Sequence, residues 1–228
     1  MNFKPLLLPQ LPALRKAILF YGIAFLIMVG VYLQPFVKVS DLTRDAVVVA
    51  KGMFYFGLIS NLGILLWCAT AAICLFTVVY LNVSKITANR DFLLYGGLLT
   101  TFLLLDDFML LHEEAIPKLL GIGEKYVVVV YPLLMVLYLA YFLNKILDTS
   151  YLVLLSALGF LALSVLTDAV APSKINELEV LFEDGFKLMG IAGWFYYFTS
   201  TSLKVLQSSV EKRFSPVEEA HKALEAVA

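Results

Sequence analysis

The sequence predicts an all-α protein, a polytopic membrane bundle of about six transmembrane helices. Of its 228 residues, 61% are apolar and only 15% are charged, and the mean hydropathy is +0.88. This composition leaves too little polar surface to cover a soluble globule. The chain also repeats apolar runs of the length, about 20 residues, that a helix needs to cross a bilayer. We therefore expect a multi-pass integral protein of the cell (inner) membrane, with the lipid bilayer as a partner.

The first two spans follow a short lead that contains prolines. Arg15 and Lys16 stand before the apolar run Ala17–Leu33, which ends at Pro35 without a small-residue cleavage pattern. We interpret this run as a retained helix and not as a cleaved signal. A mixed polar and apolar connection leads to the second expected span, Met53–Leu81, which is long enough to tilt.

Four more spans are expected in the remainder of the chain. The third, Phe92–His112, stops before Pro117, since proline and the glycines after it mark a turn. The fourth and fifth are the apolar runs Tyr126–Leu143 and Tyr151–Val170. The sixth helix is expected over Lys174–Leu206, which is longer than a bilayer requires, so its first turns would project above the hydrocarbon.

Domain organisation and orientation follow from the same runs. Without an internal repeat or a linker, residues 1–206 are expected to form a single bundle and residues 207–228 a short soluble cytoplasmic tail. Ten Lys and Arg residues fall on the side of the N-terminus against seven on the other, which predicts that both termini are cytoplasmic. Twelve of the eighteen Asp and Glu residues fall on the opposite face, so that face is expected to be acidic.

The stretch Leu103–Glu114, LLLDDFMLLHEE, is the clearest candidate for a functional site. It places Asp106 and Asp107 inside an apolar helix and ends with His112 and two glutamates. Ionisable groups within a membrane span are costly, by a few kcal/mol each on insertion scales, and are rare unless they are paired or functional. We therefore expect the chemistry of the protein to lie at this end of the third helix.

Helical geometry sorts the residues of this stretch into two faces. At about 100° per residue, Thr100, Asp107 and Glu114 share one face, and Asp106 and Glu113 share another. The third helix therefore offers carboxylates in two directions.

The sixth helix carries a matching polar stripe, in which successive members are three or four residues apart. A polar stripe in a membrane helix should face protein or water and not lipid. We therefore expect the third and sixth helices to face each other, with Asp168 of the fifth helix nearby. The stripe consists of Asn176, Glu179, Glu183, Lys187, Gly190, Trp194, Tyr197 and Thr201.

A cluster of carboxylates with one imidazole suits a divalent metal ion, which would also offset the repulsion among the acids. His112 is the one histidine available there, because His221 lies in the tail, so a zinc site with three imidazoles is excluded. The predicted metal ligands are Asp106, Asp107, His112, Glu113, Glu183 and Asp184.

Most of these residues also have a structural interpretation. Glu183 and Lys187 can form an ordinary i, i+4 pair on one helix. Glu113 and Glu114 can simply be solvated at the surface, and His112 can be a polar residue of the membrane interface. Asp106 and Asp107 fit a purely structural role least well, because both lie inside the helix.

Three classes of function agree with this pattern. The first is a metal-dependent, hydrolase-like membrane enzyme that acts on a lipid or another amphiphile, with Asp107 or His112 as base and Lys187 stabilising negative charge. The second is a cation- or proton-coupled transporter or channel subunit, and the third is a structural or assembly protein. Polarity confined to one side favours a dead-ended site over a pore, so the enzyme is preferred.

Several other classes are excluded by missing motifs. The sequence has no Walker pattern, GxSxG elbow, HExxH pair or GxGxxG turn, which argues against nucleotide use and against those hydrolase types. It also has no basic patch that would indicate a nucleic-acid partner.

Overall fold

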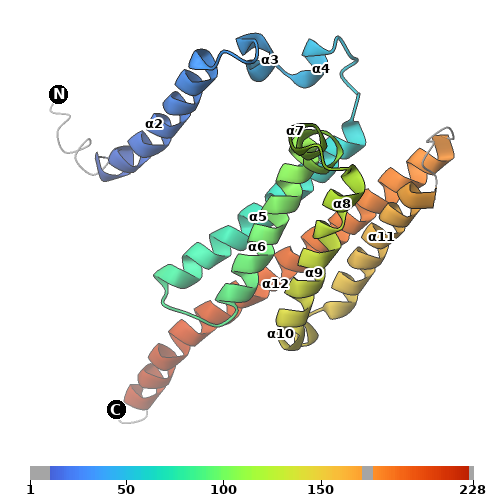
Figure 1. The fold of residues 1–228 in the computed structure, drawn as a ribbon. Helices are drawn as coiled ribbons and strands as arrows, with labels where there is room; N and C mark the ends of the chain where they lie inside the picture. The colour runs from blue at the N-terminus through green and yellow to red at the C-terminus, as the bar shows by residue number, and fades with distance from the viewer. Residues whose placement is uncertain (1–10, 171–176, 226–228) are drawn as a thin grey trace. The chain divides into compact units, whose positions relative to one another are not determined.

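The structure, a computed structural model, describes residues 11–170 and 177–225, and all of its regular elements in these ranges are helices (Figure 1). The all-α prediction is thus confirmed. By length and composition, three of the described helices could cross a membrane: Leu58–Val83, Arg90–Met109 and Tyr151–Ala169. The structure therefore supports a membrane protein with three candidate spans.

The chain divides into two compact units, residues 1–56 and 57–228, which are described separately. In the first unit, α2 (Leu11–Leu33) contains the first expected span and is followed by α3 (Val39–Thr43) and α4 (Ala46–Val49). After the end of α2, Oε1 of Gln34 accepts hydrogen bonds of 2.9 Å from the backbone N–H groups of Phe36 and Val37.

The second unit is a bundle built on four long helices. Helix α5 packs against α6, and α12 packs against both α5 and α11 (Figure 1). α11 covers the residues predicted for the fifth span, whereas α5 begins five residues later than expected, after Gly57 in the left-handed conformation. The bounds of these helices are α5 (Leu58–Val83), α6 (Arg90–Met109), α11 (Tyr151–Val170) and α12 (Glu177–Glu225).

The fourth expected span is broken into three helices: α8 (Glu124–Val128), α9 (Val130–Tyr141) and α10 (Leu143–Leu147). Pro132 explains the first break. It lacks the N–H group that would bond to the carbonyl of Val128, so the ladder is interrupted between α8 and α9.

The end of α6 differs from the prediction in a way that shapes the site. The helix was expected to run to His112, but it ends at Met109 because Leu110 adopts the left-handed conformation, with φ of 51°. A π-helix, η2 (Leu111–Ala115), and a short helix, α7 (Ile116–Leu120), follow. The two aspartates therefore lie in the last turn of α6, closer to the helix end than expected.

The sixth predicted helix is longer than expected. Residues 174–176 lie outside the described residues, and α12 then runs without a break from Glu177 to Glu225. Residues 207–225, predicted as a separate tail, continue this helix. That they are soluble and cytoplasmic stays a prediction.

Glycines let the long helices approach closely. A Cβ atom on Gly96 of α6 would lie 2.5 Å from Cε1 of Phe198, and one on Gly193 of α12 would lie 3.0 Å from the Cβ of Ala157. Small residues at helix interfaces are typical of membrane bundles, whose helices associate through close packing. Phe198 also stacks on Phe92, with ring centroids 6.0 Å apart. The core thus contains close contacts at glycines, with the Phe198 ring against Gly96 and Ala157 against Gly193.

Substituting Gly96 with alanine should destabilise the bundle by about 1 to 3 kcal/mol, because the added methyl overlaps the Phe198 ring. Denaturant unfolding in mild detergent measures this difference. Gly159→Ala is the matched control, since nothing lies within 4 Å of a Cβ there, and it should leave stability unchanged or slightly increased. Equal stability of the two variants would contradict this packing.

Candidate functional site

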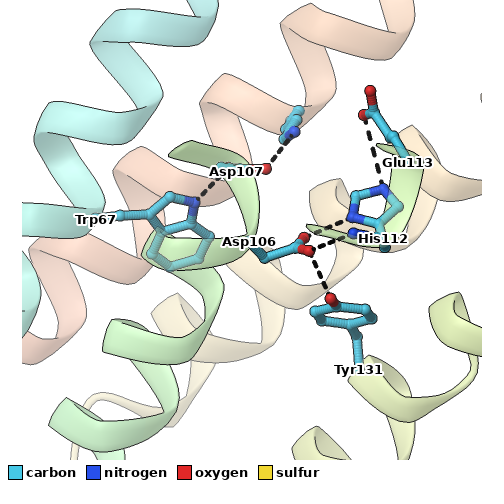
Figure 2. Close-up of polar contacts among 7 residues, drawn as sticks. Trp67, Asp106, Asp107, His112, Glu113 and Tyr131 are labelled. Carbon is cyan, nitrogen blue, oxygen red and sulfur yellow. Dashed lines mark hydrogen bonds and ion pairs between the residues drawn. The ribbon is translucent and has the colours of Figure 1, made fainter. Parts of the chain in front are cut away.

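The two adjacent aspartates at the end of α6 turn to different sides (Figure 2). Asp106 faces His112 and Tyr131, whereas Asp107 faces Trp67 of α5. Asp106 is only 4% exposed, and the Asp107 side chain is 11% exposed. Each carboxylate therefore needs partners from the protein, and each has a separate set.

Asp106 accepts three hydrogen bonds. Its Oδ1 accepts from the backbone N–H of His112 at 3.0 Å and from the Tyr131 hydroxyl at 2.5 Å, and its Oδ2 lies 2.6 Å from Nδ1 of His112. Tyr131 is held in turn by its ring, which stacks on Phe102 of α6 with centroids 5.3 Å apart. We call these three residues, Asp106, His112 and Tyr131, the histidine network.

The break after α6 makes this network possible. The left-handed residue Leu110 turns the chain so that the first turn of η2 lies over the Asp106 carboxylate. The backbone N–H of His112 is one of the groups that the start of a helix leaves without an internal partner. Asp106 therefore satisfies that group and orients the imidazole at the same time.

His112 is held in an electrostatic setting that favours its charged form. The hydrogen bond to Asp106 is the largest cause that raises the pKa of His112, burial opposes it, and the charge of Glu113 adds to the increase. Nε2 lies 3.7 Å from Oε1 of Glu113, and the imidazole is 21% exposed. One ring nitrogen is thus bonded to Asp106, and the other faces the carboxylate of Glu113.

Asp107 joins three helices. Its Oδ2 accepts from the indole N–H of Trp67 at 2.9 Å, and its Oδ1 accepts from Nζ of Lys187 at 2.7 Å. Trp67 is on α5 and Lys187 is on α12, so the predicted contact between the third and sixth helices is confirmed. We call Trp67, Asp107 and Lys187 the lysine network.

Thr100, predicted on the same face as Asp107, accepts a hydrogen bond of 3.0 Å from the indole N–H of Trp194. That face of α6 therefore meets α12 at two levels. Glu114, predicted on this face as well, lies beyond the end of α6, where it forms an ion pair with Lys118. The contacts of Thr100 and Asp107 with α12 confirm the face assignment within the helix.

A hollow of about 20 Å³ lies beside the lysine network. Asp107, Lys187, Asp184 and Ser60 contribute polar atoms to its wall, and Gly63 and Ile59 are among its other neighbours. This volume is enough for one water molecule, which needs roughly 10 to 15 Å³ and two or more polar partners.

The structure separates the predicted catalytic residues. Asp107 and Lys187 are bonded to each other, whereas His112 is bonded to Asp106. Among the predicted metal ligands, Asp184 borders the hollow and Glu183 is half-buried one turn before Lys187. Within residues 11–170 and 177–225, no three His, Cys, Asp or Glu side chains are grouped so that they could hold a metal ion. The divalent cation stays a prediction.

Sequence reasoning did not assign a role to Trp67 or Tyr131. A signal existed for both, because a buried indole N–H or phenol hydroxyl usually finds a hydrogen-bond partner. Trp67 stands in an otherwise apolar helix, and Tyr131 precedes the proline that breaks the fourth span. The sequence did not show that either residue lies close to the aspartates in the fold.

A comparison with known protein families assigns the chain to one family. A family model described as "Domain of unknown function (DUF8692)" matches residues 17–201. The chain belongs to this family. Every residue of the two networks falls within the DUF8692 match, whereas the last part of α12 falls outside it. No curated protein and no solved structure matches the chain.

Replacing Lys187 with methionine should lower the free energy of unfolding of this DUF8692 protein by about 1 to 3 kcal/mol, because Asp107 then lacks its cationic partner. We expect less than for a fully buried pair, since the Lys187 side chain is 37% exposed. Adding Asp107→Asn to this variant should recover part of the loss, because the unpaired charge is then removed.

The control for this experiment is Lys118→Met, which removes a cation from a well-exposed ion pair and should change stability little. Unfolding by denaturant in mild detergent measures five proteins: the unmodified protein, Lys187→Met, Asp107→Asn, the double variant and the control. A double variant that loses as much as the sum of the two single variants would contradict a direct pair between Asp107 and Lys187.

Proposed function

We propose that this protein is an integral membrane enzyme of hydrolase type in which His112 is the acid–base group, and that its substrate is a lipid or another amphiphile. One observation carries the proposal: Asp106 fixes Nδ1 of His112, while Nε2 lies 3.7 Å from Glu113 on an imidazole that is 21% exposed. An imidazole oriented by a carboxylate on one nitrogen is the usual arrangement of a general base.

The chemistry follows from the two ring nitrogens. Nε2 of neutral His112 accepts a proton from water while the water oxygen bonds to the carbonyl carbon of the substrate and the π electrons of the carbonyl group move to its oxygen. These electrons then re-form the carbonyl double bond as the bond from the carbon to the leaving oxygen breaks, and the imidazolium returns the proton to the leaving oxygen. Asp106 keeps its charge throughout and stabilises the imidazolium. Tyr131 holds Asp106 in place.

The raised pKa of His112 supports this role. A general base works best when its pKa is near the operating pH, because both protonation states are then available during turnover. The hydrogen bond to Asp106 moves the pKa upward from the ordinary value of 6.5. A higher pKa makes His112 the stronger base.

Two further features support a membrane substrate and a structural role for the lysine network. His112 follows the end of α6, a helix of membrane-crossing length, so a substrate could reach it from the bilayer boundary. Lys187 is engaged by Asp107, and we assign this pair to holding α6 and α12 together, in place of the direct catalytic roles expected from the sequence.

The activity test uses a fluorogenic long-chain carboxylic ester in detergent micelles as the probe. Purified protein should hydrolyse it, and His112→Gln should lower the rate by about 10² to 10⁴-fold, the usual contribution of a general base. His221→Gln, outside the DUF8692 match, should keep the full rate. Equal rates for the His112 variant and the unmodified protein would refute the proposed role.

The proposed mechanism uses no metal ion, and whether the protein binds the expected divalent cation is to be measured. Asp106 and Asp107 both accept hydrogen bonds from protein donors, so a cation at either one would have to share the carboxylate oxygens with these donors or displace them. Metal analysis of the purified protein in mild detergent, before and after a chelator, decides whether the enzyme carries a cation.

Cation- or proton-coupled transport is the second candidate, and the water-sized hollow beside Asp107 and Lys187 favours it. A water there could exchange protons with the charged pair. Proton or cation flux into proteoliposomes would then depend on Asp107, whereas ester hydrolysis would not.

We also propose six spans with both termini in the cytoplasm. The three membrane-length helices support this topology. Further support comes from the shorter apolar helices in α2 and α9 and from the uncharged stretch 188–203 of α12. Reporter fusions after Lys145 and after Lys118 should report cytoplasmic and external locations respectively. The reverse pattern would place the histidine network on the cytoplasmic side.

A further inference from the structure

A second and much larger cavity lies at the opposite end of α6 from the aspartates. Its volume is about 540 Å³, which falls within the range of roughly 300 to 1,000 Å³ typical of small-molecule sites. Three segments form it: the end of α5, the connection to α6, and one turn of α12. The proposed hydrolase site does not include this cavity, so a function of the cavity can be tested independently of hydrolysis.

The lining of the cavity suits an anion. Lys85 supplies a positive charge, and Ser84, Asn89 and Ser208 supply hydroxyl and amide groups. Within the described part of the chain, the lining includes no acidic side chain. Apolar residues of the last turn of α5, such as Val83, form part of the wall. A cation and several hydrogen-bond donors beside an apolar surface match the chemistry of a phosphate group attached to an apolar body.

The backbone at Lys85 is a second observation. The N–H of Ile86 bonds to the carbonyl of Leu81 at 2.9 Å, which closes the end of α5 in the manner of a Schellman motif. Lys85 then occupies the left-handed position of that motif, with φ of 57°, where glycine is the usual residue. A lysine at a glycine position is conformationally unfavourable, and at Lys85 this position borders the cavity.

Asn89 adds to this evidence from the other end of the connection. It too adopts the left-handed conformation, with φ of 59°, and it too lines the cavity. Backbone strain of this kind persists where the surrounding structure requires it and often lies at ligand sites. Both strained residues of the connection between α5 and α6 therefore border one cavity.

The location of the cavity points to the source of the anion. It lies at the end of α5, a helix of membrane-crossing length, and phospholipid headgroups occupy that level of a bilayer. Basic residues at this level attract anionic lipids.

We propose that this cavity binds a phosphate group, carried by the headgroup of a membrane phospholipid or as free phosphate, with Lys85 as its cationic partner. Ser84, Asn89 and Ser208 donate hydrogen bonds to the phosphate oxygens. The acyl chains of a lipid would leave the cavity along the apolar surface of α5.

The test measures binding to the full-length protein in mild detergent by native mass spectrometry, with dioctanoyl phosphatidylglycerol and inorganic phosphate as separate probes. Lys85→Gly should weaken binding about tenfold or more, since a charge-assisted hydrogen bond is lost. Ser208→Leu, which fills the cavity from α12, should weaken it as well. Binding of the lipid alone identifies a headgroup site, and equal displacement of the lipid by phosphate identifies a site for free phosphate.

The variant Lys85→Gly is chosen because glycine suits the backbone at this position, so its melting temperature should equal or exceed that of the unmodified protein. Lys51→Gly is the matched control: Lys51 is also an exposed lysine in the left-handed conformation, with φ of 54°, and it lies outside the cavity. Unchanged binding in Lys85→Gly, or no binding of either probe to the unmodified protein, would overturn the proposal.

Discussion

The structure depends on one constraint: two adjacent carboxylates at the end of an apolar helix must be given partners, because burying an unpaired charge is strongly unfavourable. The surrounding elements supply those partners. Helix α5 contributes Trp67, α12 contributes Lys187, and the connection after α6 returns His112 to the aspartate that precedes it. The packing of the bundle and the geometry of the site are therefore consequences of the same requirement.

The two aspartates do different work because successive residues of a helix are about 100° apart. Asp107 faces the helices that form the bundle, and its two bonds join three of them. Asp106 faces the side where the chain leaves α6, and its bonds fix the imidazole of His112, whose other nitrogen lies beside Glu113. One aspartate thus stabilises the bundle while its neighbour sets the protonation of His112. At the other end of α6, Lys85 and Asn89 show a similar pattern, in which local backbone strain gathers polar groups around a cavity.

Patterns of period and composition predicted much of this arrangement. The all-α class, the fifth span and the meeting of Asp107 with the polar stripe of the sixth helix all follow from residue spacing alone. The positions at which the helices break did not follow from residue spacing. Leu110 is an unusual residue for a left-handed position, so no signal marked the end of α6 there, and the pairing of Asp106 with His112 depends on that turn. Tyr131 reaches Asp106 from α9. The position of α9 depends on contacts across the bundle, which sequence spacing does not encode.

The titration of His112 by NMR in the unmodified protein, in Asp106→Asn and in Asp107→Asn tests the central claim most directly. We predict a pKa above the ordinary 6.5 in the unmodified protein and in Asp107→Asn, and a lower pKa in Asp106→Asn, where burial remains and the hydrogen bond to a carboxylate is lost. Because the folded state raises this pKa, the stability it contributes is present below about pH 6.5 and is lost as the pH rises through the folded value. A pKa of His112 that is the same in Asp106→Asn as in the unmodified protein would contradict the account.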